Sequence, residues 1–413
     1  MRHLLRFVFI ISVLLVQAIA SDVPEKRPYV ILISLDGFRW DYLDRGITPN
    51  LMALADEGAR ALSLQPAFPS LTFPNHYTIA TGLYPQNHGL IDNVFRNPYS
   101  GKHYSMYDTT TVRDDYWYGG ETLWVTARKN GLKSASYFWV GSETHLPYKH
   151  PDYYKNYDGS IRHDKRVDEI ARWLQLPRDK RPQLIFLYFS DVDTYGHRSG
   201  PDGASLNKAV AKVDSSIGYL RSRLNEIGMK DSINIIVVSD HGMTSTEGKK
   251  VIALSDLFAV ERYKMEVHST VAHIYIKNPQ QAKQLYKQIK EKENGFRVFL
   301  HDEVPRYWHF SRHPFIGDLV LVADMGNFLV KDKEEKSRRE KRKPKGMHGY
   351  DTFELDMHGL FVAAGPAFKQ GYRLGTLQNV DIYPLVCKIL NIIPNQKIDG
   401  RLERIEAVLK PVE

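Results

Sequence analysis

The stretch YVILISLDG at residues 29–37 decides the fold of this 413-residue chain. Its apolar run is stopped abruptly by Asp36 and Gly37, and similar runs recur at residues 183–189 (QLIFLYF) and 233–238 (INIIVV). Such uninterrupted runs are typical of parallel strands that are buried on both faces. Helical patterns lie between and beside them, at residues 50–57, 121–130, 165–174 and 204–227. This alternation predicts an α/β fold with a doubly wound, mostly parallel central sheet.

A second region, from about residue 251 to 330, has a different pattern. It combines the strand-like VAHIYIK, a helix over 279–292 and the strand-like FRVFL. We expect this region to form a lid or a smaller inserted subdomain. The chain then returns to a buried strand in HGLFVAAG and to a helix over 380–390.

Residues 1–20 have the pattern of a secretory signal peptide. Arg2 and Arg6 precede a short apolar run, and Ala18-Ile19-Ala20 matches a signal-peptidase site. The run is too short to cross a bilayer, so we expect residues 21–413 to be exported without a membrane anchor; an uncleaved anchor is the alternative. The single cysteine, Cys387, and the lack of an Asn-x-Ser/Thr acceptor favour a bacterial periplasmic or secreted protein. The sequence leaves the oligomeric state open.

The formal net charge of +8 is unevenly distributed. Two of the cations, Arg2 and Arg6, lie in the predicted signal peptide, and the segment 331–345 (KDKEEKSRREKRKPK) holds nine basic and four acidic residues. The rest of the chain is nearly neutral, so we expect no stable nucleic-acid partner. A run of this kind is usually a solvated loop, and the functional alternative is a flexible flap that attracts anionic substrates.

Acidic residues follow each of the three apolar runs. Asp36 follows the first, Asp191 and Asp193 follow the second, and Asp240 follows the third. Ligands of open parallel sheets bind just beyond the carboxyl ends of the strands, so these acids should converge there. Taken singly, each acid could be a turn former or a helix cap. Together they would repel one another unless a cation lay between them, and the cluster therefore predicts a metal site.

Histidines accompany these acids. His241 follows Asp240 directly, and His197 lies four residues after Asp193. A third imidazole could come from His348 or from His358. Mixed imidazole and carboxylate ligands suit zinc better than magnesium, and there are enough of them for two ions.

The segment 69–77 (PSLTFPNHY) offers a nucleophile. Pro74 suits the first turn of a helix, which would place Thr72 at a helix N-terminus that favours an anion. A threonine hydroxyl beside zinc would lose its proton near neutral pH. Alternatively, Thr72 simply caps the helix.

These motifs resemble those of the nucleotide pyrophosphatase/phosphodiesterases, within the alkaline phosphatase superfamily, as a bacterial-type single catalytic domain. The resemblance runs from about residue 29 to residue 398 and implies an alkaline-phosphatase-like α/β/α sandwich. Five motifs carry it, in the order of the family: SLDGFR (34–39), FPSLTFPNHYTIATGLYPQNHGLIDN (68–93), DVDTYGHRSGP (191–201), SDHGM (239–243) and MHGYD (347–351).

The resemblance implies two zinc ions and a role for each matching residue. One zinc would be held by Asp36, Thr72, Asp240 and His241, and the other by Asp193, His197 and His348. Thr72 matches the nucleophile that forms a phosphothreonine intermediate. Asn93 matches the residue whose amide stabilises charge on the phosphoryl oxygen, whereas Asp191 and His358 match no ligand.

The resemblance also implies a substrate class. Phe73 and Tyr154 match the aromatic pair that holds the base of a nucleotide, so the expected products are nucleoside 5′-monophosphates. Related enzymes cleave choline or lipid phosphodiesters, or phosphomonoesters, with the same metal core. A catalytically silent relative that binds polyanions is a further alternative. Sulfatases are disfavoured because Cys387 lies in an apolar helix away from the acids.

Overall fold

A computed structural model of the chain describes residues 28–411, and the predicted signal peptide lies outside the described residues. The main sheet contains β1 (Tyr29–Leu35), β2 (Ala59–Ala61), β6 (Ser134–Tyr137), β7 (Tyr153–Lys155), β8 (Leu184–Phe189), β9 (Ile233–Val238), β18 (Phe361–Ala364) and β19 (Tyr372–Leu374). These strands are ordered β19-β2-β18-β9-β1-β8-β6-β7. The three apolar runs of the sequence form β9, β1 and β8, which are adjacent, parallel and buried at the centre of the sheet.

The direction of β18 differs from that of the strands beside which it lies. It is antiparallel to both β9 and β2, with Val362 paired to Val237 on one side and to Arg60 on the other. The sheet is therefore mostly parallel, as predicted, with one reversed strand near an edge.

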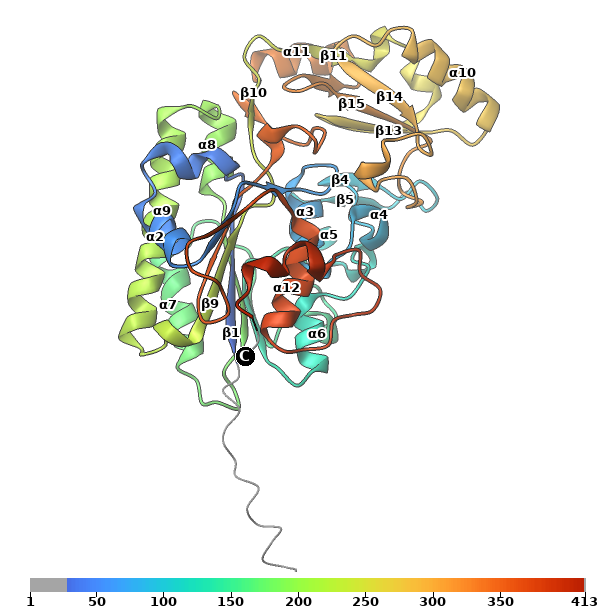
Figure 1. Cartoon of the computed structure of the whole chain (residues 1–413). Helices are drawn as coiled ribbons and strands as arrows, with labels where there is room; N and C mark the ends of the chain where they lie inside the picture. Colours follow the sequence, from blue (N-terminus) through green and yellow to red (C-terminus); the bar gives the residue numbers. More distant parts are fainter. Residues whose placement is uncertain (1–27, 412–413) are drawn as a thin grey trace, which may run out of the picture.

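Helices cover both faces of the main sheet and give three layers (Figure 1). One face packs against α2 (Pro49–Glu57), α7 (His163–Leu174), α8 (Asp191–Ser199) and α9 (Ala204–Glu226). The opposite face packs against α3 (Thr72–Thr81), α6 (Leu123–Lys129) and α12 (Ile382–Ile389), which buries Cys387 in the core. Alternate residues of β1 point to the two faces, so Ile31 and Ile33 join the first core and Val30 and Leu32 the second. The predicted α/β/α sandwich is confirmed.

Residues 251–345 form a second lobe above the main sheet (Figure 1). Its four-stranded antiparallel sheet has the order β12-β13-β15-β14. One face of this sheet packs in an apolar core within the lobe, and the other face shares a core with the main body, where Val271 and Val320 lie with Phe68 and Leu90. The lobe contains β11 (Val251–Ala253), β12 (Lys264–His268), β13 (Val271–Tyr275), α10 (Pro279–Lys290), β14 (Phe296–Leu300), β15 (Leu319–Ala323), β16 (Phe328–Val330) and α11 (Lys333–Lys341).

The basic segment 331–345 is not simply a loop, because residues Lys333–Lys341 form helix α11. Asp332 caps this helix by accepting a hydrogen bond from the backbone N–H of Glu335. None of the nine helical residues is buried, so helix formation needs no apolar face here. The segment returns to the main body at Lys345, whose backbone N–H donates to the carbonyl oxygen of His197.

Short elements complete the main body. They are β3 (Leu64–Gln65), α4 (Pro85–His88), β4 (Val94–Arg96), β5 (His103–Ser105), α5 (Thr109–Arg113), β10 (Thr244–Ser245), β17 (Gly346–Met347) and β20 (Leu377–Gln378). Strands β10 and β17 pair at the point where the chain leaves for the second lobe and comes back. Among residues 28–411, no helix has the length and apolar character needed to cross a membrane.

Candidate active site

The carboxyl ends of β1 and β9 bring Asp36, Asp240 and His241 together. Asp36 follows β1 directly and Asp240 lies two residues beyond β9, and because the two strands are parallel neighbours, both carboxylates reach the same edge of the sheet. The His241 Nε2 atom lies 3.4 Å from Asp36 Oδ1 and 3.1 Å from Asp240 Oδ2. All three side chains are buried. We call this group the first cluster.

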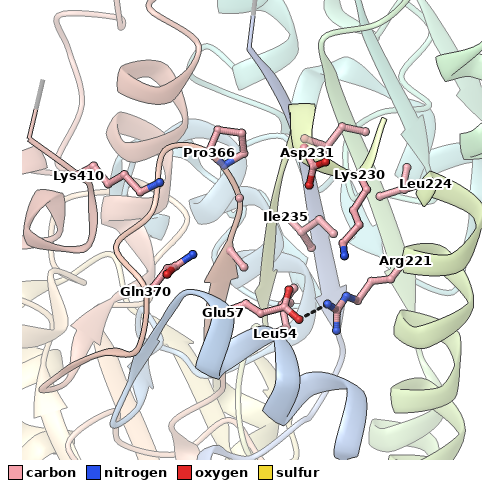
Figure 2. A pocket seen from close by; sticks show the side chains of 13 residues that line it. Leu54, Glu57, Arg221, Leu224, Lys230, Asp231, Ile235, Pro366, Gln370 and Lys410 are labelled. Carbon is pink, nitrogen blue, oxygen red and sulfur yellow. Dashed lines mark hydrogen bonds and ion pairs between the residues drawn. The ribbon is translucent and has the colours of Figure 1, made fainter. Parts of the chain in front are cut away.

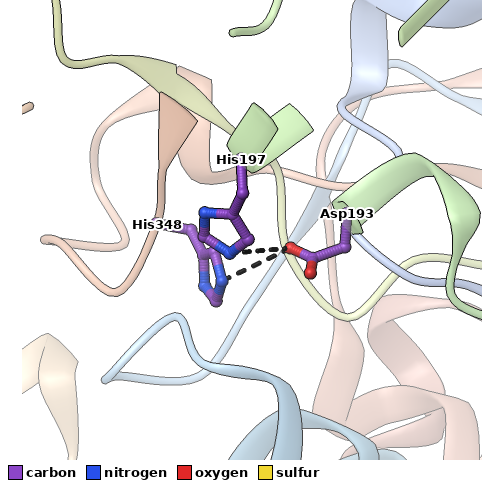
Figure 3. Close-up of side chains that lie close together, drawn as sticks. All are labelled: Asp193, His197 and His348. Carbon is purple, nitrogen blue, oxygen red and sulfur yellow. Dashed lines mark ion pairs between the residues drawn. The ribbon is translucent and has the colours of Figure 1, made fainter. Parts of the chain in front are cut away.

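Asp193, His197 and His348 form a second cluster (Figure 3). Asp193 and His197 are one turn apart on α8, and His348 follows β17. The Asp193 Oδ1 atom lies 3.3 Å from His197 Nε2 and 3.4 Å from His348 Nε2. One carboxylate oxygen is thus shared between two imidazoles that come from distant parts of the chain.

The two clusters adjoin. The rings of His241 and His348 are stacked with their centroids 3.5 Å apart, and the backbone N–H of Asp193 donates to the carbonyl oxygen of Asp36. Gly37 makes this approach possible, since it has a φ of +66° and a Cβ there would lie only 2.8 Å from the Asp193 Cα. Both clusters therefore face one small volume at the end of the sheet.

The donor atoms of both clusters fit bound cations. Three buried oxygens, Asp36 Oδ1, Asp193 Oδ1 and Asp240 Oδ2, have no hydrogen-bond partner among the described residues. Each histidine uses Nδ1 against a backbone carbonyl, which fixes the tautomer and leaves the Nε2 lone pair facing the carboxylates. The Nδ1 contacts are His197 to Gly346, His241 to Gly242, and His348 to Ser70.

The pKa shifts of residues in the two clusters also favour bound cations. Burial, together with the negative charges of Asp240 and Asp193, raises the pKa of Asp36 well above its usual value. Burial and the neighbouring imidazoles of His241 and His197 lower the pKa of His348 well below its usual value. Cations would remove the repulsion between the carboxylates, and a neutral His348 is the form that binds a metal.

Thr72 lies beside the first cluster. It is the first residue of α3, and the N-cap position belongs to Leu71, whose side chain makes no capping bond. The Thr72 Oγ1 atom lies 3.1 Å from His241 Nε2, and the residue is only 7% exposed. The hydroxyl therefore faces the first cluster instead of capping the helix.

Asn93 is fixed against the same helix start. Its side-chain Oδ1 accepts a hydrogen bond of 2.9 Å from the backbone N–H of Phe73, the residue after Thr72. Its backbone carbonyl accepts from the N–H of Met106. With Oδ1 bound to the backbone of Phe73, the NH₂ group is the donor that the Asn93 side chain can offer to another group.

The two predicted base-binding aromatics lie in different surroundings. Phe73 is partly buried near Tyr104, at the start of α3. Tyr154 lies on the edge strand β7 and packs against His150. Tyr157 is connected to the first cluster through Tyr188, and the centroids of the two rings lie 6.2 Å apart. Tyr188 in turn donates a 2.5 Å hydrogen bond to Asp36 Oδ2.

Two residues near the motifs have other partners. Asp191 binds His163 and Lys212 on the outer side of α8, and His358 contacts Ser63 and the Thr352 carbonyl. Neither belongs to a cluster.

The sequence interpretation missed His76, which contacts both Thr72 and Asp240. Its Nδ1 contacts the carbonyl oxygen of Thr72, its Nε2 contacts Ser34, and its ring lies 3.4 Å from Asp240 Oδ2. Its position one turn after Thr72 in a helix was the available signal.

A pocket of about 310 Å³ lies at the other end of the sheet (Figure 2). It is lined by Ile233 and Ile235 at the start of β9, and its rim includes an ion pair between Arg221 and Glu57. Because Asp240 lies beyond the opposite end of β9, this pocket is not part of the candidate active site.

Comparison with known proteins gives consistent results. The family model described as type I phosphodiesterase / nucleotide pyrophosphatase matches residues 30–351. An uncharacterized pyrophosphatase/phosphodiesterase of Schizosaccharomyces pombe is 36% identical over 91% of this chain and 79% of its own length. Ectonucleotide pyrophosphatase/phosphodiesterase family member 1 of Homo sapiens is 34% identical over 92% of this chain. The chain spans 42% of the length of that human protein.

Among solved structures, murine ectonucleotide pyrophosphatase/phosphodiesterase 5 is similar over 93% of this chain and all of that chain, with a TM-score of 0.86 and 30% identity. That structure is of an inactive variant in complex with AMP. The range matched by the family model includes every residue of the two clusters and Thr72. This chain belongs to the type I phosphodiesterase / nucleotide pyrophosphatase family, whose named members are phosphoric diester hydrolases.

Proposed function

We propose that this chain is an exported, zinc-dependent nucleotide pyrophosphatase/phosphodiesterase that releases nucleoside 5′-monophosphates. The observation that carries the proposal is the position of Thr72, at the start of α3 and 3.1 Å from His241, beside two adjoining clusters of unpaired carboxylates and correctly oriented imidazoles. A nucleophile, an anion-favouring helix N-terminus and two cation sites in one buried volume suit in-line phosphoryl transfer.

The residues divide between two ions. Asp36, Asp240 and His241, together with the Thr72 hydroxyl, would hold one zinc, and Asp193, His197 and His348 would hold the other. When bound, the two ions supply the positive charge that acidifies the Thr72 hydroxyl and neutralises the phosphoryl oxygens. Imidazole and carboxylate donors in each cluster favour zinc over magnesium.

The chain's own residues carry the covalent steps. The Thr72 hydroxyl loses its proton to solvent water, Oγ1 forms a bond to phosphorus, and the leaving group departs with the electron pair of the broken P–O bond; an alkoxide leaving group takes up a proton from water. Water then attacks the phosphothreonine, and the bond between phosphorus and Oγ1 breaks to regenerate Thr72. The Asn93 NH₂ group donates to a phosphoryl oxygen as charge builds there, since its Oδ1 is fixed by the Phe73 N–H.

A nucleotide base would stack between aromatic side chains near Thr72. Phe73 follows the nucleophile directly, and Tyr157 lies beside Tyr188, which contacts Asp36. We therefore propose Phe73 and Tyr157 as the base-binding pair and give Tyr154 a peripheral role. Stacking accepts any base because every base has a π-face, so we expect broad base specificity.

Two other phosphate-ester activities on the same metal residues are the alternatives to this function, namely cleavage of choline or lipid phosphodiesters and of phosphomonoesters. The exposed aromatic ring of Tyr157 near the site favours nucleotides. A silent polyanion-binding role would leave the intact ligand geometry without a use.

The test is hydrolysis of p-nitrophenyl thymidine 5′-monophosphate and ATP by the purified protein, before and after chelation and after zinc is restored. Glycerophosphocholine and p-nitrophenyl phosphate serve as comparison substrates, and a Thr72→Ala variant as the control for contaminating enzymes. We expect AMP and pyrophosphate from ATP, loss of activity on chelation and recovery with zinc. No activity on any of these esters with zinc bound would refute the proposal.

Export is part of the proposal because the pattern of residues 1–20 is that of a signal peptide and the named relatives include ectonucleotide enzymes. We propose a periplasmic or secreted location for the mature chain. Expression of the full chain in a bacterial host, followed by N-terminal sequencing of the exported protein, should give a start near Ser21. A full-length protein retained in the cytoplasm would contradict export.

A further inference from the structure

The carboxylate of Asp92 is fully buried next to Asn93 and has little to balance its charge. Its Oδ1 accepts a 3.2 Å hydrogen bond from the backbone N–H of Val94 and lies 2.7 Å from the Nδ1 atom of His268. Its Oδ2 has no hydrogen-bond partner among the described residues. A buried carboxylate is costly unless it is paired, so His268 is its principal partner.

His268 comes from the second lobe. It is the last residue of β12, a strand that packs against β4, and its side chain is 22% exposed. The charged groups that act on it are Asp92 from the main body and Arg339 from α11. Burial acts to lower the pKa of His268, but the Asp92 carboxylate outweighs this, and the pKa is raised. The imidazolium form is therefore favoured next to Asp92.

Three contacts from different parts of the chain thus fix the segment that contains Asn93. Phe73 at the start of α3 binds the Asn93 side chain, Met106 binds its backbone carbonyl, and His268 contacts the preceding side chain, Asp92. Of these three contacts, only that with His268 comes from the second lobe. Loss of the ion pair would leave the Asp92 charge buried and unbalanced one residue from the proposed phosphoryl-binding amide.

We propose that His268 is a positioning residue for the reaction: through its ion pair with Asp92 it lets the second lobe fix the Asn93 amide against the developing phosphoryl charge. This inference rests on the proposed function, because it assigns a role to the amide of Asn93. An amide that acts mainly in the transition state affects kcat more than KM. We therefore expect His268 to influence kcat and to do so through Asn93.

A second ion pair, between β4 and β12, provides a matched control. Arg96 of β4 contacts Glu266 of β12, 2.5 Å apart, and the Arg96 side chain is partly exposed, at 42%. This pair also joins the second lobe to the main body but does not contact Asp92 or Asn93. Removing it with Arg96→Ala tests whether any loosening of the lobe is sufficient to change kcat.

The experiment is a double-mutant cycle on the zinc-loaded full chain with p-nitrophenyl thymidine 5′-monophosphate. We expect His268→Gln to lower kcat about tenfold, a part of what a lost oxyanion donor costs, and to change KM less than about threefold. In an Asn93→Ala background the same change should have less than about a twofold effect. Equal fold-losses in both backgrounds would overturn the proposal, as would a loss of similar size in Arg96→Ala.

A second variant tests the charge itself and remains informative if His268→Gln does not fold. His268→Lys keeps a cation opposite Asp92 at all pH values at which the enzyme is stable. The wild-type kcat should fall as pH rises through the pKa of His268, whereas kcat of His268→Lys should lack this step. Superimposable pH profiles would contradict the charge role. Because wild-type turnover is measured first, failure of the proposed function would appear as an inactive wild type and is distinguishable from failure of this inference.

Discussion

The Oγ1 atom of Thr72 lies 3.1 Å from the Nε2 atom of His241, although the two residues are 169 positions apart in the chain. The contact forms because α3 begins at Thr72 and points its first turn at the edge where β1 and β9 end. The helix N-terminus and the first cluster are therefore directed at the same volume. A phosphate group placed there would meet the hydroxyl, the helix N-terminus and the metal-ligand residues together.

Replacement of Thr72 should separate chemistry from metal binding. We expect Thr72→Ala to lower kcat by at least about a thousandfold, because the chain then has no nucleophile at the start of α3. Zinc content should fall little, because Asp36, Asp240 and His241 remain. Thr72→Ser keeps a hydroxyl and should retain measurable turnover. Steady-state kinetics and metal analysis of the three proteins check this, and a fully active alanine variant would exclude Thr72 as the nucleophile.

Each cluster should lose its own ion when its carboxylate is removed. Asp36→Asn and Asp193→Asn each take away a buried, unpaired oxygen that repels its neighbours in the absence of a cation. We expect each variant to bind about one zinc instead of two and to lose most of its activity. Inductively coupled plasma mass spectrometry of dialysed protein measures the ratio. Asp202→Asn, at a largely exposed carboxylate, is the control and should keep both ions.

The two candidate base-stacking tyrosines can be told apart. Tyr157→Ala should raise KM for nucleotide substrates about tenfold or more, because stacking on an aromatic ring is worth about 1–3 kcal/mol per base. Tyr154→Ala should change KM less than about twofold, since its ring packs against His150. Neither change should affect p-nitrophenyl phenylphosphonate, which has no base. The opposite ranking would restore Tyr154 as the partner of Phe73.

Helix α11 should speed the capture of anionic substrates. Its Lys333, Arg338 and Lys341 side chains are exposed, and the segment ends at Lys345, next to the backbone of His197. Neutralising Arg338, Lys341 and Arg342 to glutamine should lower kcat/KM for ATP about threefold at low ionic strength and weaken its salt dependence. The same number of changes on α10, at Lys283, Lys287 and Lys290, is the control. Equal effects of both triple variants would argue against a local role for α11.

His273 should make the protein sensitive to mild acid. Burial lowers the pKa of its imidazole from 6.5 to about 4, so below the ordinary histidine pKa the unfolded chain binds a proton that the folded chain does not. Stability is then lost as pH falls through this window. Between about pH 7 and about pH 5 this amounts to about 2 kcal/mol of unfolding free energy. Guanidinium unfolding of His273→Gln at both pH values should show that much less loss than the wild type, whereas the exposed His301→Gln should match it.

The central strands could be predicted from the sequence because strands that are buried on both faces are long apolar runs. Strands β1, β8 and β9 are covered on both faces, so nearly every position is apolar, with Ser34 and Asn234 as the polar exceptions, and the acids that follow them mark the edge where the site forms. Strand β18 is also an apolar run in the sequence. Its antiparallel direction, however, depends on how the chain returns from the second lobe, and no local sequence pattern predicts that. Helix α11 was interpreted as a loop because it has no apolar face, although Asp332 and Glu335 have the spacing of a helix cap.

The residues of the two clusters could be predicted because aspartates and histidines recur together after neighbouring strands and fall in the motifs of the family, whereas a single acid after a strand, such as Asp191, can have another use. The supporting residues could not, since their roles depend on contacts made in three dimensions. Tyr154 and Tyr157 lie close together in the sequence, but β7 ends between them, at Lys155. Tyr154 therefore belongs to the edge strand, whereas Tyr157 lies beside Tyr188. The pairing of Asp92 with His268 joins two elements 176 positions apart, and neither residue lies in an unusual local pattern.

The pairing of β10 with β17 holds His241 and His348 close together, whatever the length of the polypeptide between them. His241 precedes β10 and His348 follows β17, and this two-stranded clasp closes the base of the second lobe with Thr244 opposite Met347. Loops of the lobe that lie away from this clasp and from the main body can therefore lengthen during evolution while the candidate ligand residues at its base keep their positions. Substrate preference in such a protein can change through those loops without a change in the residues at the end of the main sheet.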